Sequence, residues 1–268
     1  MKPALQFNEP LNEPNMEGIY LSRFHEQGWV TLPHVFDPDS VDEFRAQVES
    51  AIRPGSVPWI PLELPDDSPL AVWPAKAPRL LEFLKRCLPH AALPVFPVLI
   101  RSGWIVRPSN PEAKHVHDWH KDGDHENVSC ANGYAPPNFL HVAMYFEDMT
   151  PECGPTWAIN RSHRDGKLSP FEEGFVETPF SPGKADVVVW DPRLWHCGGA
   201  RTKNGTRICA VFNYVGVIVN GTQSTASPSQ QKAYFQAQND AEKILYGGQF
   251  VPFGEEEMYS ISLAKNKL

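Results

Sequence analysis

The spacing of hydrophobic residues predicts helices in the first third of the chain and strands after it. Residues 17–29 follow a helical pattern that stops at Gly28, and a strand is expected over 29–32. Residues 40–43 read Ser-Val-Asp-Glu, which has the form of a capping box with Ser40 as the N-cap of a second helix. Behind this box a core-facing stripe recurs at helical spacing, at Val41, Phe44, Val48 and Ile52.

Pro54-Gly55 is expected to end that helix, and the proline-rich, acidic residues 53–75 are predicted to form loops. A third helix is predicted over 79–87, before Pro89. The later pattern is typical of strands, over 95–108, 141–148, 185–190 and 207–217. Short strands with Pro and Gly turns between them indicate a sandwich or jelly roll. The predicted fold is therefore mainly β with flanking helices (α+β).

The C-terminal part has a different pattern. After Gly221 a polar stretch leads into a helix predicted over 230–246, which Gly247-Gly248 ends. The sequence shows no internal repeat and no change of composition that would mark a second domain boundary. We therefore expect a single domain over 1–268, with a core at about 20–217 and a C-terminal extension over 218–268.

Composition narrows the class of protein. The 27 prolines are about twice average usage and favour turns and short strands over a helical bundle. A net charge of −8 disfavours a nucleic-acid or anionic-membrane partner. Five cysteines without a CxxC pair suit reduced thiols, and no apolar run resembles a signal peptide or a membrane span. We expect a cytoplasmic protein that binds neither nucleic acid nor membrane.

Candidate chemistry is concentrated in residues 115–125, which read HVHDWHKDGDH and hold four histidines and three aspartates. Imidazole and carboxylate groups are natural ligands for a divalent metal and are costly to bury unpaired. In an extended strand, the spacing of His120 and Asp122 places both side chains on one face. Two ligands do not make a site, so a third is needed.

His196 is the candidate third ligand. It follows the apolar strand 187–190, after a break at Asp191-Pro192, and precedes a glycine pair where backbone can approach a ligand closely. If residues 187–217 formed an antiparallel pair, His196 and the start of the second strand would lie near one another. Two histidines and one aspartate form the facial triad of non-haem Fe(II) oxygenases, which leaves three coordination positions open.

Arg207 follows His196 by eleven residues and opens the next strand. A dicarboxylic keto acid could chelate the metal while its far carboxylate meets this guanidinium, which binds carboxylates in a bidentate manner. An HxD tripeptide alone is a weak signal, since a second one occurs at 163–165. The order is the stronger signal: HxD, a histidine 76 residues after His120, then an arginine.

These motifs give the chain a resemblance to the phytanoyl-CoA dioxygenase family of Fe(II)/2-oxoglutarate-dependent oxygenases, over roughly 20–217. FHEQGWVTLPHVFDPDSVDEFRAQVE resembles the family's N-terminal strand and helix, WHKDGDH its WHxD motif, HVAMYFEDMTPECGPTWAINRSHRDG its Gly-Ser-His-Arg region, and HCGGARTKNGTR its distal histidine-to-arginine stretch. The resemblance implies a double-stranded β-helix with an iron site and a 2-oxoglutarate site. It places His120, Asp122 and His196 on iron, and Arg207 and Thr156 on 2-oxoglutarate.

The same resemblance assigns further residues. The second HxD falls on the family's structural Ser-His-Arg segment, and Asn160-Arg161 stand where relatives usually have Pro-Gly. His117 occupies a position where relatives often have a glutamine that touches 2-oxoglutarate, so it has either a cosubstrate or substrate role or a purely structural one. We expect His115, His125 and His141 to line the pocket or to pack. The carboxylate of Asp122 argues for oxidation, because halogenating relatives have a small residue there.

We therefore expect a dioxygenase that uses Fe(II), 2-oxoglutarate and O2 to oxidise a small molecule, in secondary metabolite or antibiotic biosynthesis. A homodimer is possible. One alternative is an acyl-CoA hydroxylase of the same family, although no basic cluster suits the phosphates of CoA and the final Asn-Lys-Leu is no peroxisomal address. A cupin-like metal enzyme without 2-oxoglutarate and a non-catalytic binding protein are the two rival classes.

Overall fold

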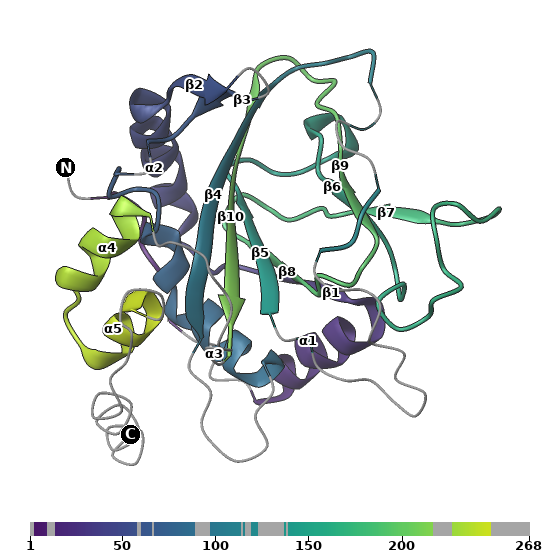
Figure 1. The fold of residues 1–268 in the computed structure, drawn as a ribbon, viewed down its shortest axis with the longest axis horizontal. Helices are drawn as coiled ribbons and strands as arrows, with labels where there is room; N and C mark the ends of the chain where they lie inside the picture. The colour runs from purple at the N-terminus through teal and green to yellow at the C-terminus, as the bar shows by residue number, and fades with distance from the viewer. Residues whose placement is uncertain are drawn as a thin grey trace.

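Two antiparallel sheets form the centre of the protein, in a computed structural model that describes residues 3–9, 14–57, 60–65, 67–88, 97–113, 115, 119–122, 137, 139–216 and 227–247. The larger sheet has the strand order β1-β8-β5-β10-β4-β3-β2, and the smaller has the order β7-β6-β9 (Figure 1). The strands are β1 (Trp29–Leu32), β2 (Arg53–Val57), β3 (Ile60–Glu63), β4 (Val98–Pro108), β5 (Phe139–Tyr145), β6 (Thr156–Ile159), β7 (Glu177–Pro179), β8 (Val187–Trp190), β9 (His196–Gly198) and β10 (Thr206–Val215).

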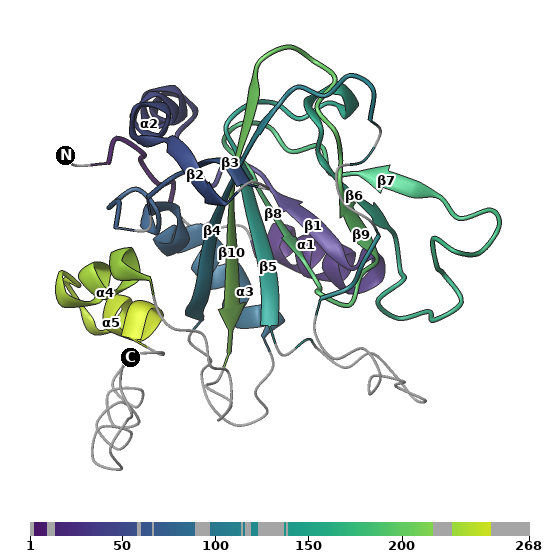
Figure 2. The same ribbon diagram turned by 45° about the horizontal axis from the view of Figure 1, so that its top comes forward.

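Helices border the larger sheet. They are α1 (Pro14–Gln27), α2 (Pro38–Ala51), α3 (Pro78–Cys87), α4 (Pro228–Phe235) and α5 (Asp240–Gly247), with short 3-10 turns η1 (Trp73–Lys76) and η2 (Pro151–Cys153). In Figure 2 α4 and α5 lie together beside β4, on the side away from the smaller sheet. Among the described residues, no helix is long and apolar enough to cross a bilayer.

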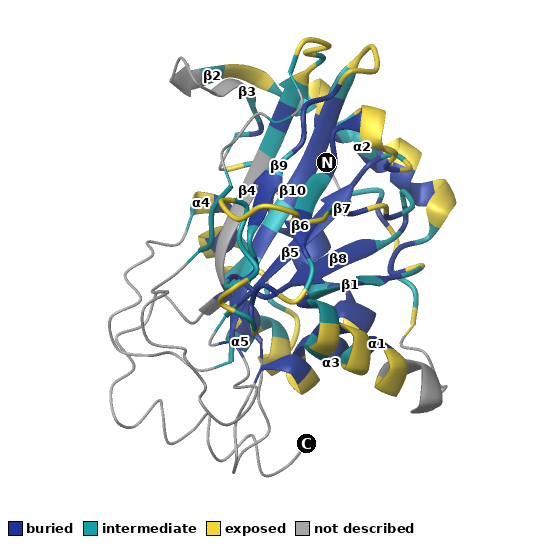
Figure 3. Ribbon diagram, turned by 90° about the vertical axis from the view of Figure 1, so that its right-hand side faces the viewer, coloured by how far each residue is buried: buried dark blue, intermediate teal, exposed yellow. Residues whose placement is uncertain are grey.

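Strand β10 shows how the alternation of side chains builds two cores. Its residues Ile208, Ala210, Phe212 and Tyr214 pack with apolar residues of α1, α2 and α3. On the opposite face Cys209 packs with residues from both sheets, including Tyr145 on β5 and Ala158 on β6. Figure 3 looks onto the smaller sheet, with buried strands of the larger sheet behind it. The larger sheet is therefore covered by helices on one face and by the smaller sheet on the other, which is a jelly-roll arrangement.

The segment with the first HxD pairs along the edge of the smaller sheet. Isolated antiparallel bridges join His115 to Gly199 and His120 to His196. Ala158 on β6 lies on the other side of His196 in register. Because β9 is held between β6 and this segment, the first HxD and the distal histidine meet although they are far apart in sequence.

Four expectations about local structure were wrong. Helix α2 starts at Pro38, and its N-cap is Asp37, whose side chain accepts a hydrogen bond from the backbone N–H of Ser40. Aspartate at the N-cap and proline at the first helical position are both strongly preferred there, so this pair overrides the capping box. Residues 53–75 are not only loops, since they contain β2, β3 and η1.

The predictions of one C-terminal helix and of a hairpin over 187–217 were the other two that were wrong. The single helix predicted over 230–246 is two helices, α4 and α5. Strands β8 and β10 do not pair with one another, because β5 lies between them. His196 is instead on β9 in the smaller sheet, a sheet change that a local sequence pattern does not reveal.

Candidate metal centre

His196 is presented by β9 as a pre-oriented metal ligand. Its side chain is buried, and its Nδ1 donates a hydrogen bond to the backbone carbonyl of Leu194 at 2.9 Å. A carbonyl can only accept, so this bond places the ring proton on Nδ1 and leaves the lone pair on Nε2. Metal-binding histidines are typically held in this way by a partner on the far nitrogen.

His120 is fixed to His196 by backbone pairing. The backbone N–H of each residue donates to the carbonyl of the other, both at 3.0 Å. Directly paired residues point to the same face of a sheet, and the two imidazole rings are accordingly 4.4 Å apart between centroids. The bridge therefore brings two imidazoles to one side of the smaller sheet.

Asp122 completes the group. Its backbone N–H donates to the carbonyl of Pro192 at 2.8 Å. Its Oδ2 lies 2.9 Å from Nε2 of His141 and 3.2 Å from Nε2 of His196. Burial raises the pKa of this carboxyl, but the two neighbouring imidazoles of His141 and His196 outweigh burial and bring the pKa well below its usual range. The carboxylate is therefore charged at neutral pH.

One ligand atom each from His120, Asp122 and His196 lies within 4.8 Å of the others. A first-row metal takes nitrogen and oxygen ligands at about 2.1 Å, so this separation is on the scale that one ion can gather. Among the residues that the structure describes, these three form the only group of His, Cys, Asp or Glu side chains with such spacing. The donor set of two imidazoles and one carboxylate fits Fe(II) with open positions.

Arg207, at the start of β10, is a buried side chain with an unsatisfied donor. It is 4% exposed, and its Nη1 donates to the carbonyls of Gly154 and Gly199. Its Nε is buried and has no hydrogen-bond partner. A buried N–H without a partner is costly. A bound carboxylate would satisfy it, so the residue fits the predicted role in binding 2-oxoglutarate.

Thr156 is the first residue of β6, the strand that pairs with β9. It pairs with Gly198, two residues along from the pairing of Ala158 with His196. At about 3.3 Å per residue, this row is about 7 Å from the row that holds His196. The hydroxyl of Tyr145 lies 2.9 Å from that of Thr156 and accepts from its backbone N–H at 3.2 Å. The two hydroxyls give a polar spot in an otherwise apolar core.

Sequence reasoning missed Arg107 on β4. It lies directly opposite Arg207 in the antiparallel register of β4 and β10. Burial, and then the charge of Arg207, lower its pKa. Like charges directly opposite one another in a sheet repel, so this end of the site favours an anion. A cross-strand pair 100 positions apart leaves no signal in the sequence.

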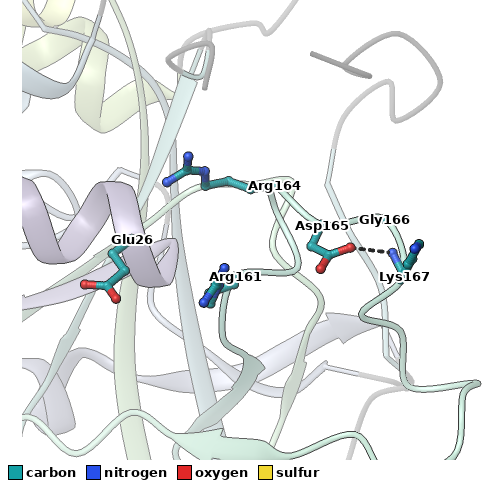
Figure 4. A pocket seen from close by; sticks show the side chains of 6 residues that line it. All are labelled: Glu26, Arg161, Arg164, Asp165, Gly166 and Lys167. Carbon is teal, nitrogen blue, oxygen red and sulfur yellow. Dashed lines mark hydrogen bonds between the residues drawn. The ribbon is translucent and has the colours of Figure 1, made fainter. Parts of the chain in front are cut away.

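The second HxD has other partners. Nε2 of His163 is 3.1 Å from the backbone carbonyl of His25, and Asp165 accepts from the backbone N–H of Lys167 at 3.0 Å. A hollow of about 570 Å³ lies beside this segment. Figure 4 shows the residues that line it, which are Glu26, Arg161, Arg164, Asp165, Gly166 and Lys167. Arg161 adopts a left-handed backbone with φ of 71°, at the turn where the family's usual Pro-Gly is replaced.

Of the other three histidines in the 115–125 stretch, His115 is the one that the structure describes. His117 and His125 lie outside the described residues. His115 faces away from the metal group, because its Nε2 lies 3.2 Å from Glu177 and its Nδ1 lies 3.4 Å from the thiol of Cys197. Cys197 follows His196 on β9, so its side chain is on the opposite face.

Comparison with known families finds one match. The family described as phytanoyl-CoA dioxygenase (PhyH) matches residues 24–209. A search of curated proteins finds no matching sequence.

Several solved structures have a similar fold. The 2-oxoglutarate-dependent epimerase SnoN from nogalamycin biosynthesis has a TM-score of 0.57 and 17% identity, covering 76% of this chain and 82% of that chain. HygX from Streptomyces hygroscopicus, with nickel, 2-oxoglutarate and hygromycin B bound, has a TM-score of 0.56 and 20% identity, covering 75% and 87%. AviO1 from Streptomyces viridochromogenes has values of 0.55 and 18%, covering 76% and 96%. These likenesses confirm the predicted double-stranded β-helix fold.

Proposed function

The chain belongs to the phytanoyl-CoA dioxygenase family, a class of 2-oxoglutarate-dependent non-haem iron enzymes, and from that premise we propose that it oxidises a C–H bond of a small molecule in secondary metabolite or antibiotic biosynthesis. One observation carries the proposal. His120, Asp122 and His196 converge, and Arg207, whose buried Nε has no hydrogen-bond partner among the described residues, bonds through Nη1 to the carbonyl of Gly199, three residues after His196. The first feature fits a divalent metal, and the second fits a carboxylate.

Each side chain has a specific task in this proposal. His120, Asp122 and His196 hold Fe(II), and Arg207 with Thr156 holds 2-oxoglutarate. His117 stays a prediction as a cosubstrate contact. When bound, iron supplies the oxidising chemistry: O2 and 2-oxoglutarate are converted to CO2 and succinate while the substrate is oxidised. The charged Asp122 occupies a position that a halide would otherwise need, so C–H oxidation is favoured over halogenation.

The core residues around the site exclude water and keep neighbouring groups neutral. Burial raises the pKa of Tyr145 above its usual range and that of Cys209 to about 11. Both side chains therefore stay protonated at neutral pH. The charged groups of the site are then Arg107, Arg207 and Asp122. The arginines suit an anionic cosubstrate at one end of the site, and the carboxylate of Asp122 suits a metal cation at the other.

The proposed substrate class is supported by the ligands described for two fold neighbours. HygX is described with hygromycin B bound, and SnoN with nogalamycin RO, Fe3+ and α-ketoglutarate. Both ligands are small molecules, SnoN is described as coming from nogalamycin biosynthesis, and we extend this kind of biosynthetic substrate to the present chain. Hydroxylation is the first expectation, and desaturation, epoxidation and ketone formation use the same site.

The proposal includes three further expectations from the sequence: one domain over 1–268, action in the cytoplasm, and a possible homodimer. For the domain, α4 contacts the core through Gln230, whose amide donates to the carbonyl of Leu99 at 2.6 Å, and through Ser229, which donates to the carbonyl of Ser68. An ion pair between Lys76 and Glu242 at 3.0 Å ties α5 to η1. Removal of residues 227–268 should therefore destabilise the whole core.

The proposal is tested by anaerobic titration of the protein with Fe(II) and 2-oxoglutarate. We expect a weak visible charge-transfer band, and its loss in the Asp122→Ala variant. Succinate release in air should then be stimulated by one member of a panel of aminoglycosides, polyketides and acyl-CoA esters. Stimulation by an acyl-CoA alone would favour the acyl-CoA hydroxylase of the same family. A protein without the band, and with 2-oxoglutarate binding unaltered by Arg207→Ala, would contradict the proposal.

A further inference from the structure

A row of three side chains crosses the larger sheet beside the metal group. Trp190 on β8, His141 on β5 and Asn213 on β10 are direct partners in the registers of the neighbouring strand pairs. Side chains at paired positions point to the same face. The row therefore lies on the face of the sheet that looks toward the smaller sheet, where Trp190 belongs to the core between the sheets.

His141 is held in one orientation by this row. Its ring stacks on Trp190 at 4.9 Å between centroids with an angle of 25°, and Phe139 contacts it edge-on at 5.3 Å. Its Nδ1 lies 2.7 Å from Oδ1 of Asn213. The residue is only 6% exposed. With one face, one edge and one nitrogen fixed, the direction of Nε2 is fixed too.

Nε2 of His141 lies 2.9 Å from Oδ2 of Asp122, and this buried nitrogen makes no hydrogen bond to any other described residue. Asp122 is less enclosed than His196, since its side chain is 38% exposed while that of His196 is 7% exposed, so a neighbouring contact can help to hold its orientation. The metal-ligating group of His120, Asp122 and His196 does not include His141, whose ring lies 6.1 Å from that of His196. His141 therefore contacts the carboxylate of a candidate ligand and is not itself one of the candidate ligands.

We propose that His141, held by Asn213 and Trp190, is a positioning residue that fixes the carboxylate of Asp122 for metal binding; this inference rests on the proposed function. A carboxylate that can rotate binds an ion less tightly, and it can also take a second coordination position with its other oxygen. That position is needed by the cosubstrate. Partners of ligating carboxylates typically change metal affinity by about 10–100-fold when removed.

The test compares metal affinity in the apo full-length protein, by calorimetric titration with Co(II) in the absence of 2-oxoglutarate. His141→Phe keeps the aromatic stack and approximate volume but removes both nitrogens, and it should weaken Co(II) binding by about 10–100-fold. His141→Gln retains one hydrogen-bonding group and should recover part of the affinity. Asn213→Leu leaves the imidazole in place but releases it, so a smaller loss is expected.

His163→Phe is the matched control, because it also replaces a buried imidazole, one whose Nε2 faces the backbone carbonyl of His25 and not a candidate ligand. We expect it to lower the thermal midpoint and leave the Co(II) affinity unchanged. A folded His141→Phe protein with wild-type Co(II) affinity would overturn the inference. So would a loss as complete as in Asp122→Ala, because His141 would then be a ligand.

A second readout separates this inference from the proposed function. If the wild type gives the charge-transfer band with Fe(II) and 2-oxoglutarate, the band of His141→Phe should shift in wavelength, whereas that of His163→Phe should not. Unchanged bands in both variants count against the positioning role. If the wild type gives no band, the proposed function fails, and the Co(II) titration still decides whether His141 orients Asp122.

Discussion

The chain contains the pattern His-x-Asp twice, and the two copies have different surroundings. At 120–122, the histidine pairs with His196 through its backbone and the aspartate lies within 3.2 Å of two imidazoles. At 163–165, the histidine contacts a backbone carbonyl and the aspartate accepts from a backbone N–H two residues on. The same tripeptide thus forms a candidate metal centre in one place and a turn in the other.

Strand pairing is the cause of this difference. The first copy lies against β9, so a third ligand is brought opposite to it. The second copy follows β6 and enters turns, where the backbone N–H groups of Arg164 and Asp165 both bond to the carbonyl of Arg161. Its aspartate is therefore used locally. Ligand spacing along the chain is necessary for such a site, and a neighbouring strand that carries the remaining ligand is what completes it.

The largest expected effect separates the two copies directly. Asp122→Ala should lose Fe(II)-dependent succinate release and the anaerobic charge-transfer band, by about 100-fold or more, because it removes a ligand and not only its partner. Asp165→Ala should keep both within about twofold, since it loses one exposed turn contact. The comparison breaks if Asp165→Ala loses metal binding, or if Asp122→Ala retains it, with both proteins folded by circular dichroism.

Arg207 sharpens the comparison, because it provides the anion site that would make the first copy an oxygenase centre. Arg207→Lys keeps the charge but loses the planar fork. Hydrogen bonds to charged groups contribute about 1.5–3 kcal/mol, so the Kd for 2-oxoglutarate should rise by about 10–100-fold. Calorimetry on the Fe(II)-free protein with Co(II) present measures this change.

Arg201→Lys is the matched control for that variant. Arg201 is also a buried arginine, but it is paired with Glu147 at 2.7 Å. Its replacement should reduce the free energy of unfolding and leave the Kd for 2-oxoglutarate unchanged. Equal losses of 2-oxoglutarate affinity in both variants would show that general destabilisation, and not the contact with the cosubstrate, accounts for the effect.

The sequence could predict those features that depend on local pattern or on order along the chain. The strand over 29–32, the helix α3 and the residues His120, Asp122 and His196 follow from spacing and from motif resemblance. Their convergence was also expected, but by the wrong route. The hairpin supposed over 187–217 does not exist, because the residues between β8 and β10 cross to the smaller sheet and β5 fills the gap.

What the sequence could not predict depends on long-range register. His141 contacts Asn213, which is 72 positions away, and it stacks on Trp190 in the next strand. Arg107 likewise faces Arg207 only because β4 and β10 are aligned as they are. A shift of one residue would move each of these side chains to the other face. Strand pairing decides such contacts, and nothing within either strand encodes the choice of partner.

His163 gives a third way to sharpen the comparison, through pH. Burial lowers its pKa to about 4, and the folded protein therefore favours the neutral ring. The unfolded chain takes up this proton first as pH falls below about 6.5, so the free energy of unfolding should fall between pH 6.5 and 4. By pH 5 the loss from this group is about 2 kcal/mol. Urea unfolding at pH 7 and pH 5 measures it.

The His163→Gln variant isolates that contribution. Other titrating groups affect both proteins, so the difference between wild type and variant reports His163 alone. We expect the drop in the free energy of unfolding from pH 7 to pH 5 to be about 2 kcal/mol smaller in the variant. If both proteins lose stability equally, His163 is not held neutral by burial, and the structural account of the second HxD is wrong.

Thr156 is expected to give the smallest effect, and it tests how much of the first site lies beyond the metal ligands. Thr156→Val keeps the shape of the side chain but removes the hydroxyl that lies 2.9 Å from Tyr145. One neutral hydrogen bond contributes about 0.5–1.5 kcal/mol, so the KM for 2-oxoglutarate should rise by about two- to tenfold with little change in kcat. Thr156→Ser retains the hydroxyl and should stay close to wild type. If valine and serine behave alike, the hydroxyl does not contact the cosubstrate, and Arg207 alone distinguishes this HxD from a bare metal site.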